Sequence, residues 1–301
     1  MPKSRKVLDI SIPVPWGVIA GKTVGEESPI PILCVHGGSD NLETFAQLLP
    51  QLPANQYYVC IDLPGHGKSS HADKGYILDL VWYTLAVKRV IEYFRWPYLY
   101  YLGHSFGGQI GFLLSAFYPE LVLKLVVIDT LMDYHISENI TARTTRQYLF
   151  DTLLKLEKRS NLDEAPTYSF KEFVQKMKEA RLTEVGDSQI KAMAERNLMK
   201  IGPDQYKFSN DQRNKLFGPI FFTRKQLESI AREISCPTLF ILGKDSTNTK
   251  PLEKLNHTPM KKIRNAIFHV IEGDHDIHLA RPEAVAHLIV PFLSGEIISK
   301  L

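Results

Sequence analysis

Short hydrophobic runs alternate with longer amphipathic stretches in two parts of the chain, from about Lys6 to Thr130 and from about Ile234 to the C-terminus. Runs such as 32–35 and 57–61 are almost wholly apolar, which is typical of strands buried on both faces of a sheet. This alternation of strands and helices predicts an α/β fold, with a mostly parallel sheet and helices on both of its faces.

The stretch between these two parts has a different character. It is rich in charged residues, contains no convincing strand, and repeats apolar positions at helical spacing in 148–156, 170–177 and 190–198. We therefore expect a helical cap, or lid, inserted after the sixth strand. The predicted domains are a core of residues 1–130 and 234–301 and a cap of residues 131–233.

Composition narrows the class of protein. The chain of 301 residues has room for one α/β domain with an insertion. A net charge of +3, from 36 basic and 33 acidic residues, argues against binding to nucleic acid. No run approaches the roughly 18–20 apolar residues that cross a bilayer. No apolar segment follows the charged start Met1–Lys6, so we expect no transmembrane segment and no secretory signal.

The cysteines indicate a reducing compartment. Cys34, Cys60 and Cys236 each fall in or beside a predicted core strand. An odd number of buried cysteines favours reduced thiols in an intracellular protein. No cysteine–histidine spacing resembles a metal site, and we expect neither a metal nor a cofactor.

The sequence Gly-His-Ser-Phe-Gly-Gly at 103–108 carries the main chemical signal. It follows the apolar run 98–102 and precedes an amphipathic stretch at 109–117, so it lies where a strand turns into a helix. The pattern G-x-S-x-G in this context is a nucleophile elbow, in which glycines relieve crowding at a sharp turn. Ser105 is therefore the predicted nucleophile.

The loop after the apolar run 32–35 is expected to stabilise an oxyanion. It reads His36-Gly37-Gly38-Ser39, and a glycine there lets the backbone approach a substrate oxygen. We expect the N–H groups of Gly38 and Phe106 to be the two donors. His36 and Gly37 are candidate substrate-binding residues, although His36 is better explained as a residue that holds the loop.

Two histidines follow the last predicted strand, 266–271. His275 lies in the loop itself, just after Gly273, and we expect it to be the general base; His278 begins the next segment and is expected to pack. The chain order of serine, acid and histidine is that of enzymes with a nucleophile elbow.

The acid has two candidates. Asp245 follows the buried run 237–242 and is preferred, because that strand directly precedes the histidine's strand. The loop Gly243-Lys244-Asp245 is one residue shorter than the commoner G-x-x-D form. Asp129 is the alternative, at the end of the strand that follows the nucleophile.

These motifs and several others resemble one known family. The chain is similar to the α/β-hydrolases and, more narrowly, to the serine hydrolase-like protein family of animals, nearly from end to end. The resemblance implies a serine nucleophile with histidine and acid partners, and it implies no particular substrate. The matching segments are 14–20, the His36-Gly37 loop with Asp40-Asn41, 65–71, 102–108, 128–130 and 211–213.

The predicted function is that of a serine hydrolase of the esterase type, which cleaves an ester or thioester of a small apolar acyl compound. The aromatic run in 216–222 suggests the apolar pocket, with Phe217, Phe221 and Phe222 as candidate substrate-binding residues. One alternative is an acyl-CoA thioesterase of peroxisomal lipid metabolism. Another is a ligand-binding homologue that turns over little.

The last three residues predict a location. Ser299, Lys300 and Leu301 form the peroxisomal import address when they stand at a free C-terminus. We therefore expect an import receptor as a partner and the peroxisome as the compartment, with the cytoplasm as the alternative.

Overall fold

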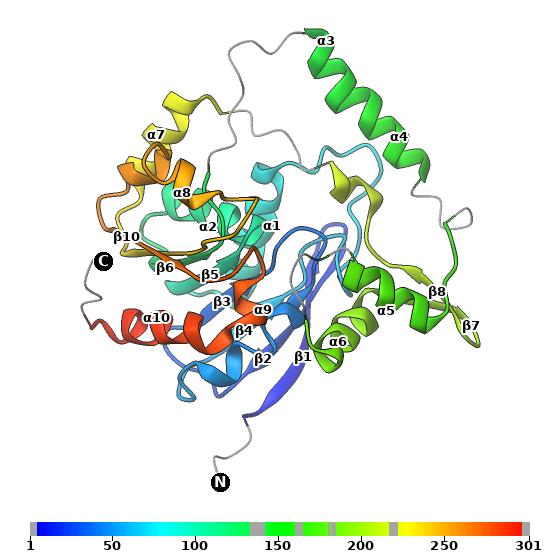
Figure 1. Ribbon diagram of the computed structural model, residues 1–301, viewed down its shortest axis with the longest axis horizontal. Coiled ribbons are helices and arrows are strands. Elements are labelled where there is room, and N and C mark those ends of the chain that lie inside the picture. Colours follow the sequence, from blue (N-terminus) through cyan, green and yellow to red (C-terminus); the bar gives the residue numbers. More distant parts are fainter. Residues whose placement is uncertain are drawn as a thin grey trace.

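An eight-stranded sheet forms the centre of the molecule, which we describe from a computed structural model (Figure 1). The structure describes residues 5–132, 142–159, 165–179, 181, 185–216 and 222–296. The strands β1 and β2 pair antiparallel, as do β2 and β4, and the remaining pairs are parallel. The predicted α/β fold is confirmed. In sheet order the strands are β1 (Val7–Val14), β2 (Gly17–Val24), β4 (Tyr58–Ile61), β3 (Ile32–Val35), β5 (Leu99–His104), β6 (Val122–Ile128), β9 (Thr238–Gly243) and β10 (Ala266–Ile271).

Helices cover both faces of this sheet (Figure 1). Alternate residues of a strand point to opposite faces, so Leu33 and Val35 join one hydrophobic cluster while Ile32 and Cys34 join the other. This is why the central strands read as uninterrupted apolar runs. The first cluster includes residues of α1 (Leu80–Phe94), α2 (Phe106–Phe117) and α7 (Arg224–Glu233). The second includes residues of η1 (Leu42–Phe45), η2 (Leu49–Gln51), α9 (Ile277–Ala280) and α10 (Pro282–Ser294).

The chain between β6 and α7, which we call the insertion, contains helices and one β-hairpin. The hairpin is β7 (Leu198–Gly202) paired antiparallel with β8 (Gln205–Phe208), so the expectation that the cap contains no strand is wrong. Aromatic residues of the hairpin pack on a small cluster that includes Phe173 and Met193. The other elements are α3 (Ala142–Thr145), the π-helical turn η3 (Arg146–Asp151), α4 (Thr152–Arg159), α5 (Phe170–Glu179), α6 (Asp187–Asn197) and η5 (Gln212–Lys215).

The C-terminal end of the predicted cap packs with the core instead. Residues 224–233 form α7, whose Leu227 and Ala231 are buried in the main core cluster, where α7 lies against α2. The sequence placed this helix in the cap because it is rich in charge, but only its outer face is charged. Two short elements, α8 (Pro251–Lys254) and η6 (Pro259–Lys262), complete the core between β9 and β10.

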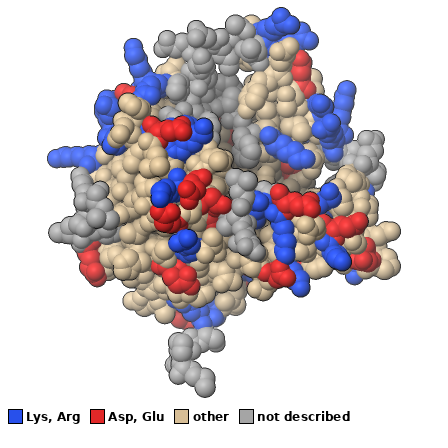
Figure 2. All heavy atoms as spheres, viewed as in Figure 1, with Lys and Arg blue, Asp and Glu red and all other residues tan. Residues whose placement is uncertain are grey.

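The surface carries both signs of charge. Lysine and arginine side chains are interspersed with aspartate and glutamate over the face shown in Figure 2, which agrees with the nearly balanced composition. Among the described helices, none combines the length and the hydropathy needed to span a bilayer. The three cysteines are buried free thiols, as predicted.

Candidate active site

Ser105 lies on the sharp turn between β5 and α2. Its backbone has φ 49° and ψ −117°, a left-handed conformation that non-glycine residues rarely adopt. The turn is held because the Ser105 N–H donates to the carbonyl of Ile128 at 2.8 Å. Strain of this kind at a residue in a cleft is typical of an active site.

Glycine is required on both sides of this turn. A Cβ at residue 103 would lie 2.5 Å from the carbonyl carbon of Gly107. A Cβ at residue 107 would lie 2.1 Å from the carbonyl oxygen of Val35, in the neighbouring strand β3. The backbone of the elbow therefore packs directly against the strand that leads to the expected oxyanion loop.

Asp129 is the acid that contacts His275. The Nδ1–H of His275 donates to Asp129 Oδ2 at 2.6 Å, and the hydroxyl of Ser246 donates to the same oxygen at 2.6 Å. Asp129 Oδ1 accepts from the N–H of Gly243 at 2.8 Å and from the hydroxyl of Thr249 at 3.1 Å. The carboxylate is fully buried, so these four donors replace the water it has lost.

The prediction that Asp245 contacts His275 was wrong, because Asp129 makes this contact. Asp245 is exposed, and its N–H donates to the carbonyl of Gly273, which ties together the loops after β9 and β10. These loops are so close that a Cβ at Gly243 would lie 2.2 Å from the carbonyl oxygen of Asp274. The shortened loop therefore brings hydroxyl and backbone donors to Asp129 instead of presenting an acid of its own.

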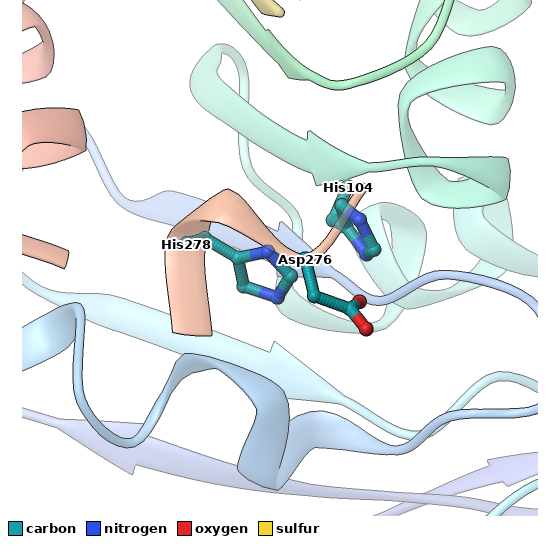
Figure 3. A group of neighbouring side chains, drawn as sticks. All are labelled: His104, Asp276 and His278. Atoms are coloured by element: carbon teal, nitrogen blue, oxygen red, sulfur yellow. The ribbon is translucent and has the colours of Figure 1, made fainter. Parts of the chain in front are cut away.

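A group of buried side chains lies beside His275. The Nε2–H of His104 donates to the carbonyl of His275 at 3.1 Å, and the ring of His104 lies 4.0 Å from the ring of His278. Figure 3 shows these two rings together with Asp276. His278 is fully buried, and its Nε2 lies 2.6 Å from the Thr44 hydroxyl. His278 therefore packs, as expected, while the side chain of His275 is 20% exposed.

Burial keeps both neighbouring histidines neutral. Loss of solvation, with a smaller contribution from the nearby His275, lowers the pKa of His104 to about 3. Burial, with smaller contributions from the neighbouring His104 and Arg181, holds the pKa of His278 well below its usual value. Neutral His104 and His278 therefore add no positive charge beside His275.

The loop after β3 is fixed by two further histidines. His36 is fully buried; its Nδ1–H donates to the carbonyl of Gly37 at 2.7 Å, and its Nε2 accepts the N–H of Leu63 at 2.9 Å. His66 Nε2 accepts the N–H of Ser39 at 3.2 Å. Burial lowers the pKa of His36 to about 4 and that of His66 to about 3, so each ring keeps an acceptor nitrogen.

This loop lies against the nucleophile. A Cβ at Gly37 would lie 3.1 Å from the Cβ of Ser105, and Gly38 shares a small pocket with Phe106. Phe106 is the first residue of α2, so its N–H points out of the N-terminus of that helix. The two residues expected to donate to the oxyanion, Gly38 and Phe106, therefore line one small pocket beside the turn that carries Ser105.

One cavity of about 710 Å³ connects these parts. Its wall includes Gly37, Gly38, Ser105 and His275 from the core. The insertion provides much of the rest of the wall, so inserted residues share one cavity with Ser105. From the insertion the wall includes Arg159, Ala165, Pro166, Tyr168, Lys176, Met177, Arg181, Asn197, Phe208, Asn210, Asp211, Gln212, Asn214 and Lys215.

Two predicted substrate-binding residues do not line this cavity. His36 is fully buried, and it does not belong to the cavity wall. Phe222 packs on the main core cluster beside α7, because the chain has already returned to the core at that point. Phe217 and Phe221 lie outside the described residues, as do Ser299, Lys300 and Leu301.

Arg181 belongs to the site, although no sequence pattern indicated it. It comes from the insertion, and its side chain is 11% exposed. Its Nη2–H donates to Asp40 Oδ1 at 2.9 Å, and its Nη1–H donates to Asp276 Oδ2 at 3.1 Å. Asp40 follows the oxyanion loop and Asp276 follows His275, so one guanidinium joins the insertion to both. A single arginine in a charged segment gives no sequence signal for such a role.

The group in Figure 3 has the ligand types of a cation site. His104, Asp276 and His278 each offer one ligand atom, and these atoms lie within 4.8 Å of one another. The Arg181 guanidinium already occupies one oxygen of Asp276 and places a positive charge there. A second cation at this position would be repelled, so the group does not fit a metal ion.

Comparisons with known proteins identify the family of this fold. Residues 30–281 match the family model described as alpha/beta hydrolase fold. A serine hydrolase-like protein of Danio rerio is 30% identical over 97% of this chain and 90% of its own. A probable serine hydrolase of Drosophila melanogaster is 30% identical over 95% and 87%. A solved hypothetical protein of Pseudomonas aeruginosa has a TM-score of 0.80 at 26% identity, covering 95% of this chain and 99% of that one.

The fold and these matches support a hydrolase. The chain belongs to the α/β-hydrolase family and, within it, to the serine hydrolase-like proteins.

Proposed function

We propose that this protein is a serine hydrolase that cleaves a carboxylic ester or thioester of an apolar acyl compound. The observation that carries the proposal is the hydrogen bond of 2.6 Å between Asp129 and His275, in a cavity whose wall also contains Ser105. A histidine held by a buried carboxylate beside an elbow serine is the arrangement of nucleophilic acyl transfer.

The reaction has two steps. Ser105 Oγ attacks the substrate carbonyl while His275 Nε2 takes its proton, and the N–H groups of Phe106 and Gly38 stabilise the oxyanion. His275 then gives the proton to the leaving alcohol or thiol, which leaves an acyl group on Ser105. A water molecule, activated by His275, attacks that acyl group and releases the carboxylic acid. Each oxyanion donor contributes roughly 3–4 kcal/mol to lowering the barrier.

The alternative of a low-turnover ligand-binding protein rested on the short acid loop. Asp129 supplies the carboxylate that this loop does not, so that argument loses its basis. A thioesterase remains within the proposed chemistry, because the same two steps cleave an acyl thioester.

Labelling of the full chain with a fluorophosphonate probe tests the proposal, followed by hydrolysis of esters from acetate to octanoate. We expect labelling of wild type, none of Ser105→Ala, and similar thermal midpoints for the two. The value of kcat/KM should rise with acyl length, since each buried methylene contributes about 0.8 kcal/mol. Continued labelling of Ser105→Ala would show that another residue is the nucleophile.

A further inference from the structure

Besides the buried Arg181, three exposed cations of the insertion border the cavity that contains Ser105. Arg159 ends α4, Lys176 lies in α5, and Lys215 ends η5. All three belong to the cavity wall yet have exposed side chains, so they lie where the cavity meets solvent. We call them the cation rim. They come from three separate elements, so the insertion supplies exposed positive charge to the cavity wall at three positions.

The rim cations have no acidic partner within ion-pair distance in the part of the chain that the structure describes. Lys176 Nζ lies 5.0 Å from the ring of Tyr168, and Lys215 Nζ donates to Gln212 Oε1 at 2.7 Å. Glu172, one turn before Lys176, accepts the N–H and the hydroxyl of Ser169, which lower its pKa, and the charge of Lys176 lowers that pKa further. Among the described residues no ion pair holds the rim cations, so their charge can act on a bound molecule.

The acidic residues of the cavity wall, by contrast, form ion pairs with arginines. Asp211 pairs with Arg213 at 2.7 Å, while Asp40 and Asp276 share the guanidinium of Arg181. Two carboxylates on one guanidinium leave no excess of positive charge near His275. A negative group beside the reacting carbonyl would therefore be disfavoured, whereas one at the mouth would be attracted.

The same cavity offers apolar surface, which we call the apolar wall. It is formed from the insertion by Ala165, Pro166, Tyr168, Met177 and Phe208. A volume of about 710 Å³ is ample for a medium-length acyl chain together with a polar group. The cavity thus joins an apolar surface to a positively charged mouth.

We infer that the substrate is an amphiphilic acyl ester or thioester, with its acyl chain against the apolar wall and a distal negative charge at the cation rim. This inference rests on the proposed hydrolase function and adds the substrate class. The charge belongs either to the far end of the acyl chain or to the leaving group. In both cases the negative group lies away from the carbonyl that Ser105 attacks.

Two matched substrate pairs test the inference on the full chain. Octanoyl-CoA and the octanoyl thioester of N-acetylcysteamine share the reacting bond, but only the first carries phosphates. The p-nitrophenyl monoester of suberic acid and p-nitrophenyl octanoate differ only in a distal carboxylate. We expect about tenfold higher kcat/KM for the anionic member of one pair at low salt, falling as salt screens the rim. Equal values within both pairs would overturn the inference.

A charge-matched pair of variants assigns the preference to the rim. The double variant Lys176→Met/Lys215→Met removes two rim charges, while Lys155→Met/Lys171→Met removes two exposed lysines of α4 and α5 that do not line the cavity. The ratio of anionic to neutral kcat/KM should fall severalfold in the first and stay unchanged in the second. An equal fall of this ratio in both double variants would mean that the net charge of the protein causes the preference. That result would overturn the assignment of the preference to the cation rim.

A binding measurement tests the cation rim even if the proposed hydrolase function fails. If wild type hydrolyses none of the four substrates, the hydrolase proposal fails, and coenzyme A and suberate are then titrated by calorimetry. Binding that is weakened by Lys176→Met/Lys215→Met and not by Lys155→Met/Lys171→Met supports a rim that recognises anions. Absence of binding by wild type overturns it.

Discussion

The side chains of Asp129 and His275 meet at 2.6 Å, although 146 positions separate the two residues in the sequence. Asp129 follows β6 and His275 follows β10, and β9 lies between these strands in the sheet. The Asp129 carboxylate therefore reaches across the end of β9, where the N–H of Gly243 also binds it. The backbone φ of 45° at Asp129 turns the chain at this point.

Replacing Asp129 by Asn should lower kcat by about 10⁴-fold, by analogy with the protease triad, because an amide cannot hold the same histidine tautomer. Replacing the exposed Asp245 by Asn should change kcat by no more than about twofold. Steady-state ester hydrolysis measures both, with circular dichroism to show that the variants are folded. The reverse ranking would restore Asp245 as the acid.

Arg181→Met should destabilise the protein by about 3–5 kcal/mol, because it leaves the buried carboxylates of Asp40 and Asp276 without a partner. Arg232→Met, in an exposed ion pair at the end of α7, is the matched control and should change stability by no more than about 1 kcal/mol. Urea unfolding measures both. Arg181→Met combined with Asp40→Asn and Asp276→Asn should recover part of the loss. Equal stability of the two single variants would contradict the role of this ion pair.

The buried histidines should make the protein sensitive to acid. The folded-state pKa values are about 4 for His36 and about 3 for His66 and His104, below the value of about 6.5 in an unfolded chain. The unfolded chain therefore binds protons below about pH 6.5 while the folded protein does not. The free energy of unfolding should be constant on this account above pH 6.5 and fall as the pH decreases.

Each such histidine contributes a slope of roughly 1 kcal/mol per pH unit over this range. Urea unfolding between pH 7.5 and 4.5 gives the number of protons taken up on unfolding. His104→Gln should reduce that number by about one, since its pKa shift is then removed. A slope that is the same in wild type and His104→Gln would exclude a neutral buried His104.

We also propose that Ser299-Lys300-Leu301 directs import into peroxisomes. The expected result is punctate fluorescence that overlaps a peroxisomal marker, for the full chain tagged at its N-terminus. A version without these three residues should be diffuse. Diffuse fluorescence of both versions would mean that the import receptor does not recognise the tripeptide.

Much of the core could be predicted from the sequence, because buried parallel strands are short apolar runs and the elbow is a local pattern. Ser105, Gly37 and His275 are found by their position after such runs, and all three line the cavity. The β7–β8 hairpin was missed because Leu198 continues the helical spacing of α6. The turn residues in 202–204 between the two strands were the signal for it.

The choice of acid could not be made from local pattern, because it depends on contacts between distant segments. Asp129 and Asp245 both follow core strands, and only the folded chain shows which one Ser246 and Thr249 surround. These two hydroxyl residues lie three positions apart in the loop after β9. The same limit applies to Arg181, whose partners are 141 and 95 positions away.

The insertion divides the reacting groups unequally between the two halves of the core. The chain up to Asp129 carries Ser105, Asp129 itself and both expected oxyanion donors, and the chain after the insertion carries His275. A cut within the insertion would thus yield one fragment with nucleophile and acid and another with the base. Neither fragment holds a complete set, so turnover by the two together would report their reassembly, as in an enzyme-complementation assay.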